Sequence, residues 1–285
     1  MNRENLSRLY DRLFQYFGIF CTIIGLMLLA IFIIQILVTG IPRLNLEFLS
    51  GLPSRIPERA GILTAWAGTL WIFFLTALIA VPLGITAAIW LEEYAPKGMW
   101  SNLLEINIAN LAGVPSVIYG ILGLGLFVQI MQLGHSLLAG SLTLALLIMP
   151  IIIVTTREAL KAVPRSLREA SYALGATQWQ TIWNQVLPAA FSSIITGIIL
   201  ALARAVGETA PLILVGALTY VPFVPRSPMD EFTVLPLQIF NWVSRPQQGF
   251  IINAAAAIIV LLVIVLLLNS IAVYLRLRAQ KNIRW

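Results

Sequence analysis

Long apolar stretches alternate with short polar segments along this chain, and six of the apolar stretches are long enough to cross a membrane. About 20 residues are needed, because the hydrocarbon layer is about 30 Å thick and an α-helix rises about 1.5 Å per residue. Only Gly134, His135 and Ser136 separate the third stretch from the fourth. We predict an all-α polytopic membrane protein with six transmembrane helices, at residues 17–39, 64–91, 106–131, 137–156, 189–219 and 251–275.

Four of the predicted spans contain a proline. A proline kinks a membrane helix and frees a backbone carbonyl, which is tolerated where that carbonyl faces protein or a water-filled path. Kinked helices suit a transporter, although bundles without transport activity contain them too. The prolines are Pro82, Pro115, Pro150 and Pro211.

One polar segment, residues 157–188, carries two signals for the start of a helix. Ser166 with Glu169, and Thr177 with Gln180, both match a capping box. In that motif a hydroxyl and a carboxyl or amide oxygen accept hydrogen bonds from the free N–H groups of a helix start. We therefore predict two short helices within this segment.

The ends of these two helices are also marked in the sequence. Gly175 is expected to end the first helix, because glycine adopts the left-handed conformation without steric cost. Pro188 is expected to end the second helix, because proline cannot donate a backbone hydrogen bond. The two helices should meet at a sharp corner near residues 173–177.

Composition agrees with a membrane protein. Hydrophobic residues are 59% of the chain and charged residues 11%, whereas a soluble domain carries about 25% charged residues. The net charge of +6 does not predict nucleic-acid binding, because Lys and Arg are dispersed and lie beside apolar runs. Cys21 lies within an apolar run and His135 is the only histidine, so we predict neither a disulfide nor a metal site. No signal-peptide cleavage pattern follows the N-terminus, so the first span is expected to remain as an anchor.

The distribution of positive charge predicts the orientation. With the N-terminus placed inside, twelve Lys and Arg residues lie in cytoplasmic segments and five in outer loops. The five outer residues are Arg43, Arg55, Arg59, Arg226 and Arg245. Because cytoplasmic loops carry an excess of Lys and Arg, both termini and the segment 157–188 should be cytoplasmic.

No motif for catalysis is present in the sequence. The chain lacks the G-x-x-x-x-G-K-[ST] loop with which many ATPases hold phosphate. It also lacks a Gly-x-Ser-x-Gly elbow and paired carboxylates in a polar context. We therefore do not predict an enzyme, and any ATP hydrolysis should come from a separate polypeptide.

One pair of charged residues lies inside an apolar span. Arg204 and Glu208 are four residues apart in the predicted fifth helix, so their side chains are expected on one helix face. A charge in the middle of a bilayer costs at least about 2.5–3.5 kcal/mol, so both should face the bundle or a cavity. Two interpretations stay open here. The pair neutralises itself as a packing clamp, or Arg204 binds a charged solute, since a guanidinium matches phosphate oxygens bidentately.

Three runs of residues resemble a known family. SLREASYALGA at 166–176 is similar to the cytoplasmic EAA loop of ABC importer permeases, and ARAVGETAP at 203–211 and GVPSVIYG at 113–120 accompany it. Together they resemble the A-type permease of the bacterial phosphate-specific transport (Pst) system over roughly residues 60–275. Thr-Ala-Pro at 209–211 favours the A-type permease over its C-type partner.

The resemblance implies a fold and a set of partners. The fold is the transmembrane domain of a type I ABC importer, with cytoplasmic coupling helices. The partners are a homologous C-type permease, two ATPase subunits and an extracytoplasmic phosphate-binding protein, all at the lipid bilayer. The ATPase subunits would hold ATP and Mg, so no cofactor is expected on this chain. The expected function is ATP-driven import of inorganic phosphate.

The resemblance also implies which residues act. The loop 166–187 would dock on the ATPase, through Glu169, Ala170, Ser171, Leu174, Gly175 and Ala176. The substrate pathway would contain Arg204, Glu208 and Thr209. Two positions depart from the general EAA pattern: Ser171 replaces an alanine, and Gln185 replaces the usual aliphatic residue.

The domain organisation follows from these assignments. Residues 1–59 would form an N-terminal cytoplasmic segment, the first span and an outer loop, residues 60–275 the importer domain, and residues 276–285 a basic cytoplasmic tail. The outer loop 220–249 is rich in proline and aromatic residues, and we expect a short helix in it at about 233–243.

Other functions remain to be weighed against the importer. A proton-coupled secondary anion transporter can also use an intramembrane Arg and Glu, but it explains the cytoplasmic double helix poorly. A permease for another oxyanion would carry the same charges. A membrane scaffold without transport activity leaves the buried charges unexplained.

Overall fold

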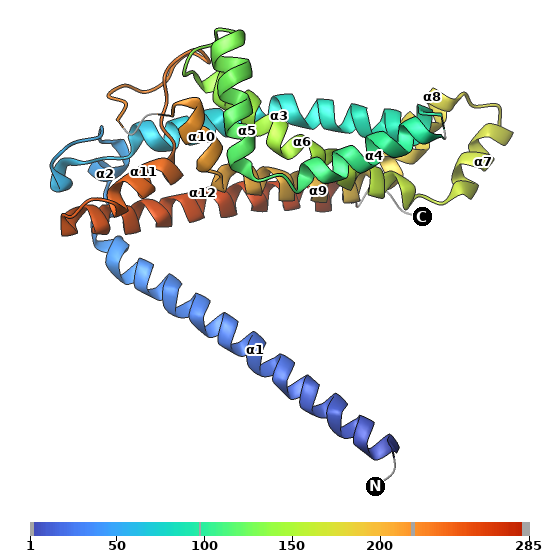
Figure 1. Ribbon diagram of the computed structural model, residues 1–285, viewed down its shortest axis with the longest axis horizontal. Coiled ribbons are helices and arrows are strands. Elements are labelled where there is room, and N and C mark those ends of the chain that lie inside the picture. The colour runs from blue at the N-terminus through green and yellow to red at the C-terminus, as the bar shows by residue number, and fades with distance from the viewer. Residues whose placement is uncertain (1–2, 97, 218–219, 281–285) are drawn as a thin grey trace.

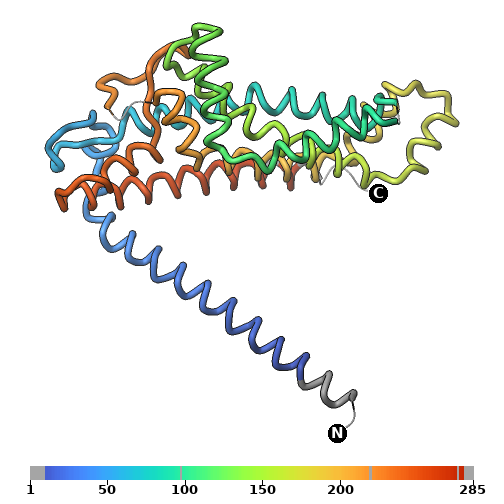
Figure 2. Tube along the Cα trace, viewed as in Figure 1, coloured from blue at the N-terminus to red at the C-terminus, as the bar shows by residue number. Residues whose placement is uncertain are grey.

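The computed structural model describes residues 3–96, 98–217 and 220–280, and every regular element in this part of the chain is a helix. Most helices run along one long axis, while α1 leaves the bundle at an angle (Figure 1), and Figure 2 shows the same path as a tube. The long helices are α1 (Arg3–Gly40), α3 (Leu63–Ile89), α6 (Leu137–Lys161), α9 (Leu187–Gly207) and α12 (Gln248–Gln280). This confirms the predicted all-α class. Lys97, the end of the fifth predicted span at 218–219 and the tail from 281 onward lie outside the described residues.

Within the described residues, the segments that are long and apolar enough to cross a membrane as unbroken helices number five: Tyr10–Arg43, Leu63–Tyr94, Leu137–Lys161, Gln178–Gly207 and Gln248–Arg278. A sixth candidate is a bent pair of helices, Met99–Ala112 and Ser116–Ile130, whose two parts make an angle of 101°. The predicted number of six holds if this bent pair is counted as one span.

The predicted continuous helix at 106–131 is therefore wrong. The chain forms α4 (Met99–Ala112), turns, and continues as α5 (Ser116–Gly123) and the π-helix η4 (Leu124–Ile130). Pro115 causes the break, because it has no N–H to donate to the Leu111 carbonyl four residues earlier. The Tyr119 hydroxyl donates to that carbonyl at 2.8 Å, alongside the Val114 N–H at 3.1 Å. Tyr119 thus ties together the two sides of the break.

The other prolines of the predicted spans behave in two ways. Pro82 and Pro150 lie inside α3 and α6, as predicted. Pro211 lies in the first turn of the short helix α10 (Ala210–Val215), where a missing N–H leaves no hydrogen bond unmade.

Pro188 does not end a helix, which corrects the prediction for residues 157–188. Helix α8 (Gln178–Thr181) runs through the π-helix η5 (Ile182–Val186) directly into α9, which has Pro188 in its first turn. The wider turns of a π-helix remove the clash between the proline ring and the carbonyl of residue 184. The segment from Gln178 to Gly207 is consequently one continuous span.

Small residues bring the central helices close together. Gly84 of α3 faces Ile152 of α6 so closely that an added Cβ would lie 2.7 Å from the Ile152 Cγ2 atom. Gly123 of α5 packs against the Thr143 side chain of α6 in the same way. Close approach of helix backbones at glycine is typical of membrane bundles, where van der Waals packing stabilises the fold.

The outer loop contains the expected short helix, α11 (Leu235–Val243). Its Trp242 is buried, with its ring centroid 6.1 Å from that of Phe48 and 6.2 Å from that of Phe250. Phe48 belongs to α2 (Leu46–Ser50), which lies between the 3₁₀ turns η1 (Ile41–Arg43) and η2 (Pro57–Arg59). This aromatic cluster fixes the loops to α12 at one end of the bundle.

Most of helix α1 lies away from the rest of the described chain. Side chains from 10 to 35 are exposed, and the first buried one is Ile36. Contact with α12 is made at Gly40, where an added Cβ would lie 2.7 Å from the Ala255 carbonyl carbon. In Figure 1 the rest of α1 diverges from the bundle. Between residues 10 and 35 this apolar helix is therefore exposed, and its packing against α12 is confined to its C-terminal end.

Candidate functional site

The predicted fifth span is broken where its charged residues lie. Helix α9 ends at Gly207, Glu208 is extended with φ −77° and ψ 124°, and α10 begins after Thr209. Pro211 explains the break, because it cannot donate to the Gly207 carbonyl and its ring would clash with that carbonyl. The prediction of one helix over 189–219 is therefore wrong at residues 208–209.

Arg204 and Glu208 form an ion pair, but not on one helix face as predicted. The Arg204 Nε atom lies 3.3 Å from Glu208 Oε1. Glu208 reaches back from the extended residue after α9, so the contact spans the end of the helix. The side chain of Arg204 is 44% exposed and that of Glu208 is 18% exposed. A second molecule can therefore contact the Arg204 side chain without a prior change in its position.

Thr209 lies between the two helices and is half-buried. Its hydroxyl makes no capping hydrogen bond to α10. This leaves the hydroxyl available as a donor or acceptor beside the Arg204–Glu208 pair.

A second helix break lies next to this one. Gly120 of α5 packs so closely against α10 that an added Cβ would lie 2.7 Å from the Pro211 Cα atom. Tyr119, which closes the break between α4 and α5, packs in one apolar cluster with Ala201 and Ala205 of α9. The structure thus brings together Tyr119 and the end of α9, a relationship that the sequence analysis missed. No pattern near Tyr119 in the sequence indicates this contact, because it joins residues about 80 positions apart.

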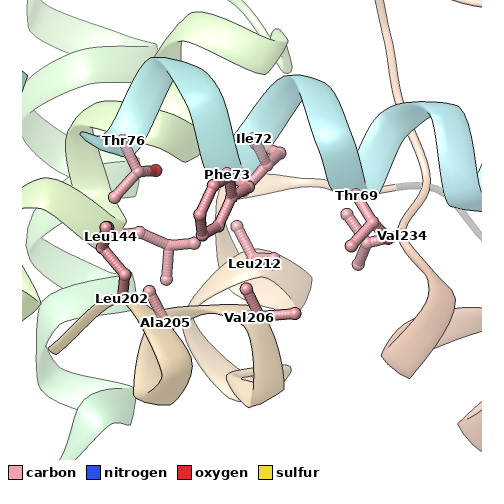
Figure 3. Close-up of a pocket in the computed structure, with 10 residues that line it drawn as sticks. All are labelled: Thr69, Ile72, Phe73, Thr76, Leu144, Leu202, Ala205, Val206, Leu212 and Val234. Atoms are coloured by element: carbon pink, nitrogen blue, oxygen red, sulfur yellow. The ribbon is translucent and has the colours of Figure 1, made fainter. Parts of the chain in front are cut away.

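A small cavity lies behind the last turn of α9, and Figure 3 shows side chains from α3, α6, α9 and α10 around it. Its volume is about 10 Å³, which is about the space of one water. Its two polar lining residues are engaged: Thr69 donates to the Ala65 carbonyl at 2.8 Å, and Thr76 donates to the Ser141 carbonyl at 3.4 Å. This cavity is a packing defect and too small for an oxyanion.

The second candidate site is the polar loop, which the structure forms from α7 (Arg165–Ala173) and α8. The predicted capping box at Ser166 and Glu169 is wrong, because α7 starts directly after Pro164 and Ser166 already lies in its first turn. The capping box of Thr177 and Gln180 is confirmed. Thr177 Oγ1 accepts from the Gln180 N–H at 3.3 Å, and Gln180 Oε1 accepts from the Thr177 N–H at 2.9 Å.

The corner between α7 and α8 depends on Gly175 and Ser171. Gly175 has φ +82°, in the left-handed region, as predicted. No atom lies within 4 Å of a Cβ added there, so the glycine is required by backbone conformation and not by space. Across the corner, Ser171 Oγ lies 2.8 Å from Thr181 Oγ1. The Ala176 N–H donates to the Ser171 carbonyl at 3.2 Å.

The predicted ATPase-contacting residues divide into two groups. Glu169, Ala170, Leu174 and Gly175 are exposed, and Leu174 is 90% exposed. Ser171 and Ala176 are half-buried and hold the corner. Glu169 forms no ion pair within the described part of the chain. Of these residues, Glu169 presents a free carboxylate and Leu174 a large apolar side chain, and the loop also exposes Tyr172, Trp179 and Trp183.

The apolar helices and this exposed helical corner define a multi-pass membrane protein of the transport class. A family described as "Binding-protein-dependent transport system inner membrane component" matches residues 80–281, and the chain belongs to that family. The family comprises ABC permeases, so membership implies partner ATPase subunits and a binding protein. The polypeptide itself is a membrane component of the transporter.

Named relatives and solved structures agree with this family. The "Probable ABC transporter permease protein YqgI" of Bacillus subtilis is 34% identical over 242 residues, which cover 84% of this chain and 80% of that protein. The "Phosphate transport system permease protein PstA 1" of Mycobacterium tuberculosis is 35% identical over 236 residues, 80% of this chain and 74% of that protein. A solved structure of the inward-facing MetNI methionine ABC transporter shares the fold, with TM-score 0.61 and 19% identity over 74% of this chain and 93% of that one.

Proposed function

We propose that this chain is the A-type permease subunit of an ATP-driven importer of inorganic phosphate. It lies in the cytoplasmic membrane with both termini inside, beside a homologous C-type permease, two ATPase subunits and an extracytoplasmic phosphate-binding protein. Similarity to phosphate permeases from several organisms, at 30–35% identity over most of the chain, supports the substrate. The excess of Lys and Arg in the segments assigned to the cytoplasm supports the orientation.

The observation that carries the proposal is the exposed guanidinium of Arg204 in an otherwise apolar span. In this chain alone 44% of that side chain is uncovered. Contact with lipid would cost at least about 2.5–3.5 kcal/mol, so a second subunit or a water-filled path must cover it. A guanidinium keeps its charge and matches two phosphate oxygens at once. Arg204 is thus suited to replace part of the water that phosphate loses on entering the membrane.

Glu208 has an indirect role in this proposal. Its carboxylate repels an anion, so it does not bind phosphate itself. It holds Arg204 when no substrate is present, and the Arg204 Nε–Glu208 Oε1 distance of 3.3 Å leaves the remaining guanidinium donors free. Thr209 adds an uncapped hydroxyl at the same break. These three residues form the proposed substrate pathway.

The proposal includes a second permease. The side chains of α1 from 10 to 35 are exposed in this chain, so they are free to face lipid or a second subunit. Six spans with a single arginine make a poor enclosure for a hydrated oxyanion, so the pathway lies between two permeases. We assign the partner as homologous but distinct because the resemblance to the Pst system extends to a two-permease assembly.

Energy reaches this chain through the loop at α7 and α8. We propose that Glu169, Ala170, Ser171, Leu174, Gly175 and Ala176 form the contact with the ATPase, with Leu174 as the apolar anchor. ATP and Mg bind the ATPase subunits, and the permease catalyses no reaction. A polar, capped corner that protrudes from a membrane bundle fits such a docking role.

The experiment is phosphate uptake into proteoliposomes that contain the full assembly. Uptake of radiolabelled phosphate should stop when ATP is omitted and continue in the presence of an uncoupler. An uncoupler-sensitive uptake that needs no ATP would instead support a proton-coupled anion transporter. ATP-dependent uptake of radiolabelled sulfate or molybdate, with no uptake of phosphate, would instead support a permease for another oxyanion.

A further inference from the structure

One arginine of the coupling loop (α7, the corner and α8) is held inside the protein instead of facing outward. Arg168 on α7 donates to Glu93 Oε1 from Nη2 at 2.7 Å and from Nε at 3.2 Å. Its guanidinium also donates to the Val163 carbonyl at 2.8 Å and to the Leu160 carbonyl at 3.0 Å. The side chain of Arg168 is 16% exposed and that of Glu93 is 8% exposed. One guanidinium therefore joins α7 to the end of α6 and to η3 (Trp90–Tyr94), the π-helix that follows α3.

Glu93 also holds the second arm of the coupling loop. The Nε2 group of Gln178, the first residue of α8, donates to the backbone carbonyl of Glu93. Both helices of the loop, α7 and α8, are thus attached to η3 at the same residue. A displacement of the loop cannot occur without moving η3 or breaking these hydrogen bonds.

From η3 the ion pairs continue to α4. Arg157 of α6 donates from Nε to Glu92 Oε2 at 3.1 Å and from Nη2 to Glu105 Oε2 at 2.8 Å. The Arg157 side chain is 13% exposed and that of Glu92 is 21% exposed, whereas Glu105 is 41% exposed, so the connection is open to water at α4. Glu105 belongs to α4, and α4 ends at the break that Tyr119 closes. The coupling loop is thus connected to the helix break beside Arg204 through ion pairs that are joined by the backbones of η3 and α4.

The low exposure of the Arg168–Glu93 pair determines how strongly it resists separation. Removing one partner of a buried ion pair leaves an uncompensated charge in a poorly solvated place, which resists separation of the pair. A surface pair such as Lys161–Glu158, with side chains 36% and 63% exposed, is screened by water and holds weakly. Arg168 and Glu93 should therefore move as one unit when the loop is displaced.

We propose that the Arg168–Glu93 pair is the joint through which a displacement of the coupling loop reaches the membrane helices. The two are positioning residues: they touch no substrate and act by keeping α7 fixed to η3. Helix α3, which continues into η3, and helix α4 then carry the displacement to the break beside Arg204. This rests on the proposed function, in which an ATPase displaces the coupling loop.

The test measures phosphate uptake and ATP hydrolysis on the same proteoliposomes with the complete assembly. The variants are Glu93→Gln, Arg168→Gln and the two combined. In each single variant the phosphate imported per ATP hydrolysed should fall at least about fivefold, the lower end of the range for coupling between distant sites. The double variant should be no worse than the poorer single variant, because both changes remove the same interaction. If the unpaired charge left in a single variant prevents assembly, the double variant, which has no unpaired charge, can still be assayed.

The matched control is Glu158→Gln, which removes a carboxylate from the same region that pairs only at the surface. Its uptake per ATP should equal that of the unaltered protein. A structural role alone would lower uptake and hydrolysis in parallel, through loss of assembled complex, and would leave their ratio unchanged.

A second readout needs no phosphate. Val117 on α5 is 46% exposed, and Val117→Cys in a Cys21→Ser background provides one reporter thiol. ATP should change the rate at which a thiol reagent labels it, and Glu93→Gln should remove that change. If the unaltered assembly imports no phosphate, the proposed function fails while this readout still tests the joint. The proposal is overturned if ATP does not change the labelling rate in the assembly that retains Glu93. It is also overturned if ATP still changes the labelling rate in Glu93→Gln. An unchanged amount of phosphate imported per ATP in all three variants would overturn it as well.

Discussion

The Arg204 guanidinium and the Glu208 carboxylate meet across the end of a helix, with Nε and Oε1 3.3 Å apart. Because Glu208 lies in extended backbone after α9, a change of its backbone torsions moves the carboxylate without moving Arg204. Two charges fixed on one regular helix would lack this freedom. The pair can therefore separate when α10 shifts relative to α9, which exposes Arg204 to an anion.

Arg204→Lys tests whether geometry or charge is needed. We expect this variant to keep the assembly but to lose most phosphate uptake, because an ammonium does not offer the planar pair of donors of a guanidinium. Glu208→Gln should also assemble and should be defective in the transport cycle. Uptake assays on purified assemblies of equal subunit composition measure both effects.

The alternative, a packing clamp, makes the opposite prediction for a double variant. If the pair only joins helices, Arg204→Leu combined with Glu208→Leu should restore assembly and uptake, since matched apolar residues replace an ion pair with little loss of stability. Normal phosphate uptake by this double variant would refute a role of Arg204 in the pathway.

Tyr119→Phe tests the helix break beside Arg204. The variant keeps the buried ring and removes the hydroxyl that donates to the Leu111 carbonyl at 2.8 Å. We expect a loss of stability of about 0.5–1.5 kcal/mol, the usual net value of one hydrogen bond, together with reduced uptake. Thermal unfolding in detergent measures the first and the uptake assay the second. Tyr274→Phe, at an exposed tyrosine of α12, is the control and should change neither.

How far the sequence predicts this structure depends on how local each feature is. The apolar runs, the positive φ of Gly175 and the helix at α11 follow from neighbouring residues, and the structure has them, with the third run as a bent pair of helices. The capping box at Thr177 is local too and is present. Ser166 matches the same motif, yet α7 begins at Arg165, because Pro164 takes the N-cap position with non-helical torsions.

The site itself depends on contacts between distant residues. Arg168 and Glu93 are 75 positions apart, and nothing near either residue indicates that they pair. The sequence identified Arg204 and Glu208 as neighbours but placed them on one helix, because Pro211 was read as a kink and not as the start of a new helix. Pro150 lies inside α6, Pro211 lies in the first turn of α10 and Pro188 follows a π-helix, so the presence of a proline in an apolar run does not by itself tell which of these occurs.

Thr69→Val tests how the outer loop is fixed to the bundle. Thr69 Oγ1 accepts a hydrogen bond from the Leu235 N–H at the start of α11, at 2.9 Å, in a buried position. Valine has nearly the same shape but leaves that N–H without a partner, so we expect a loss of about 1–3 kcal/mol. Thr69→Ser keeps the hydroxyl and should retain most of the stability. Equal melting temperatures of the two variants would contradict this role.

Gly175→Val tests the corner of the coupling loop. Valine at φ +82° is strained by its branched Cβ, although the space around it is open, so the corner should open and Leu174 should lose its position. We expect weaker co-purification of the ATPase subunits, with membrane insertion unchanged. Gly175→Asn is the matched control, because asparagine tolerates the left-handed conformation, and it should retain the ATPase. Normal ATPase recovery with Gly175→Val would show that the conformation of this corner does not determine docking.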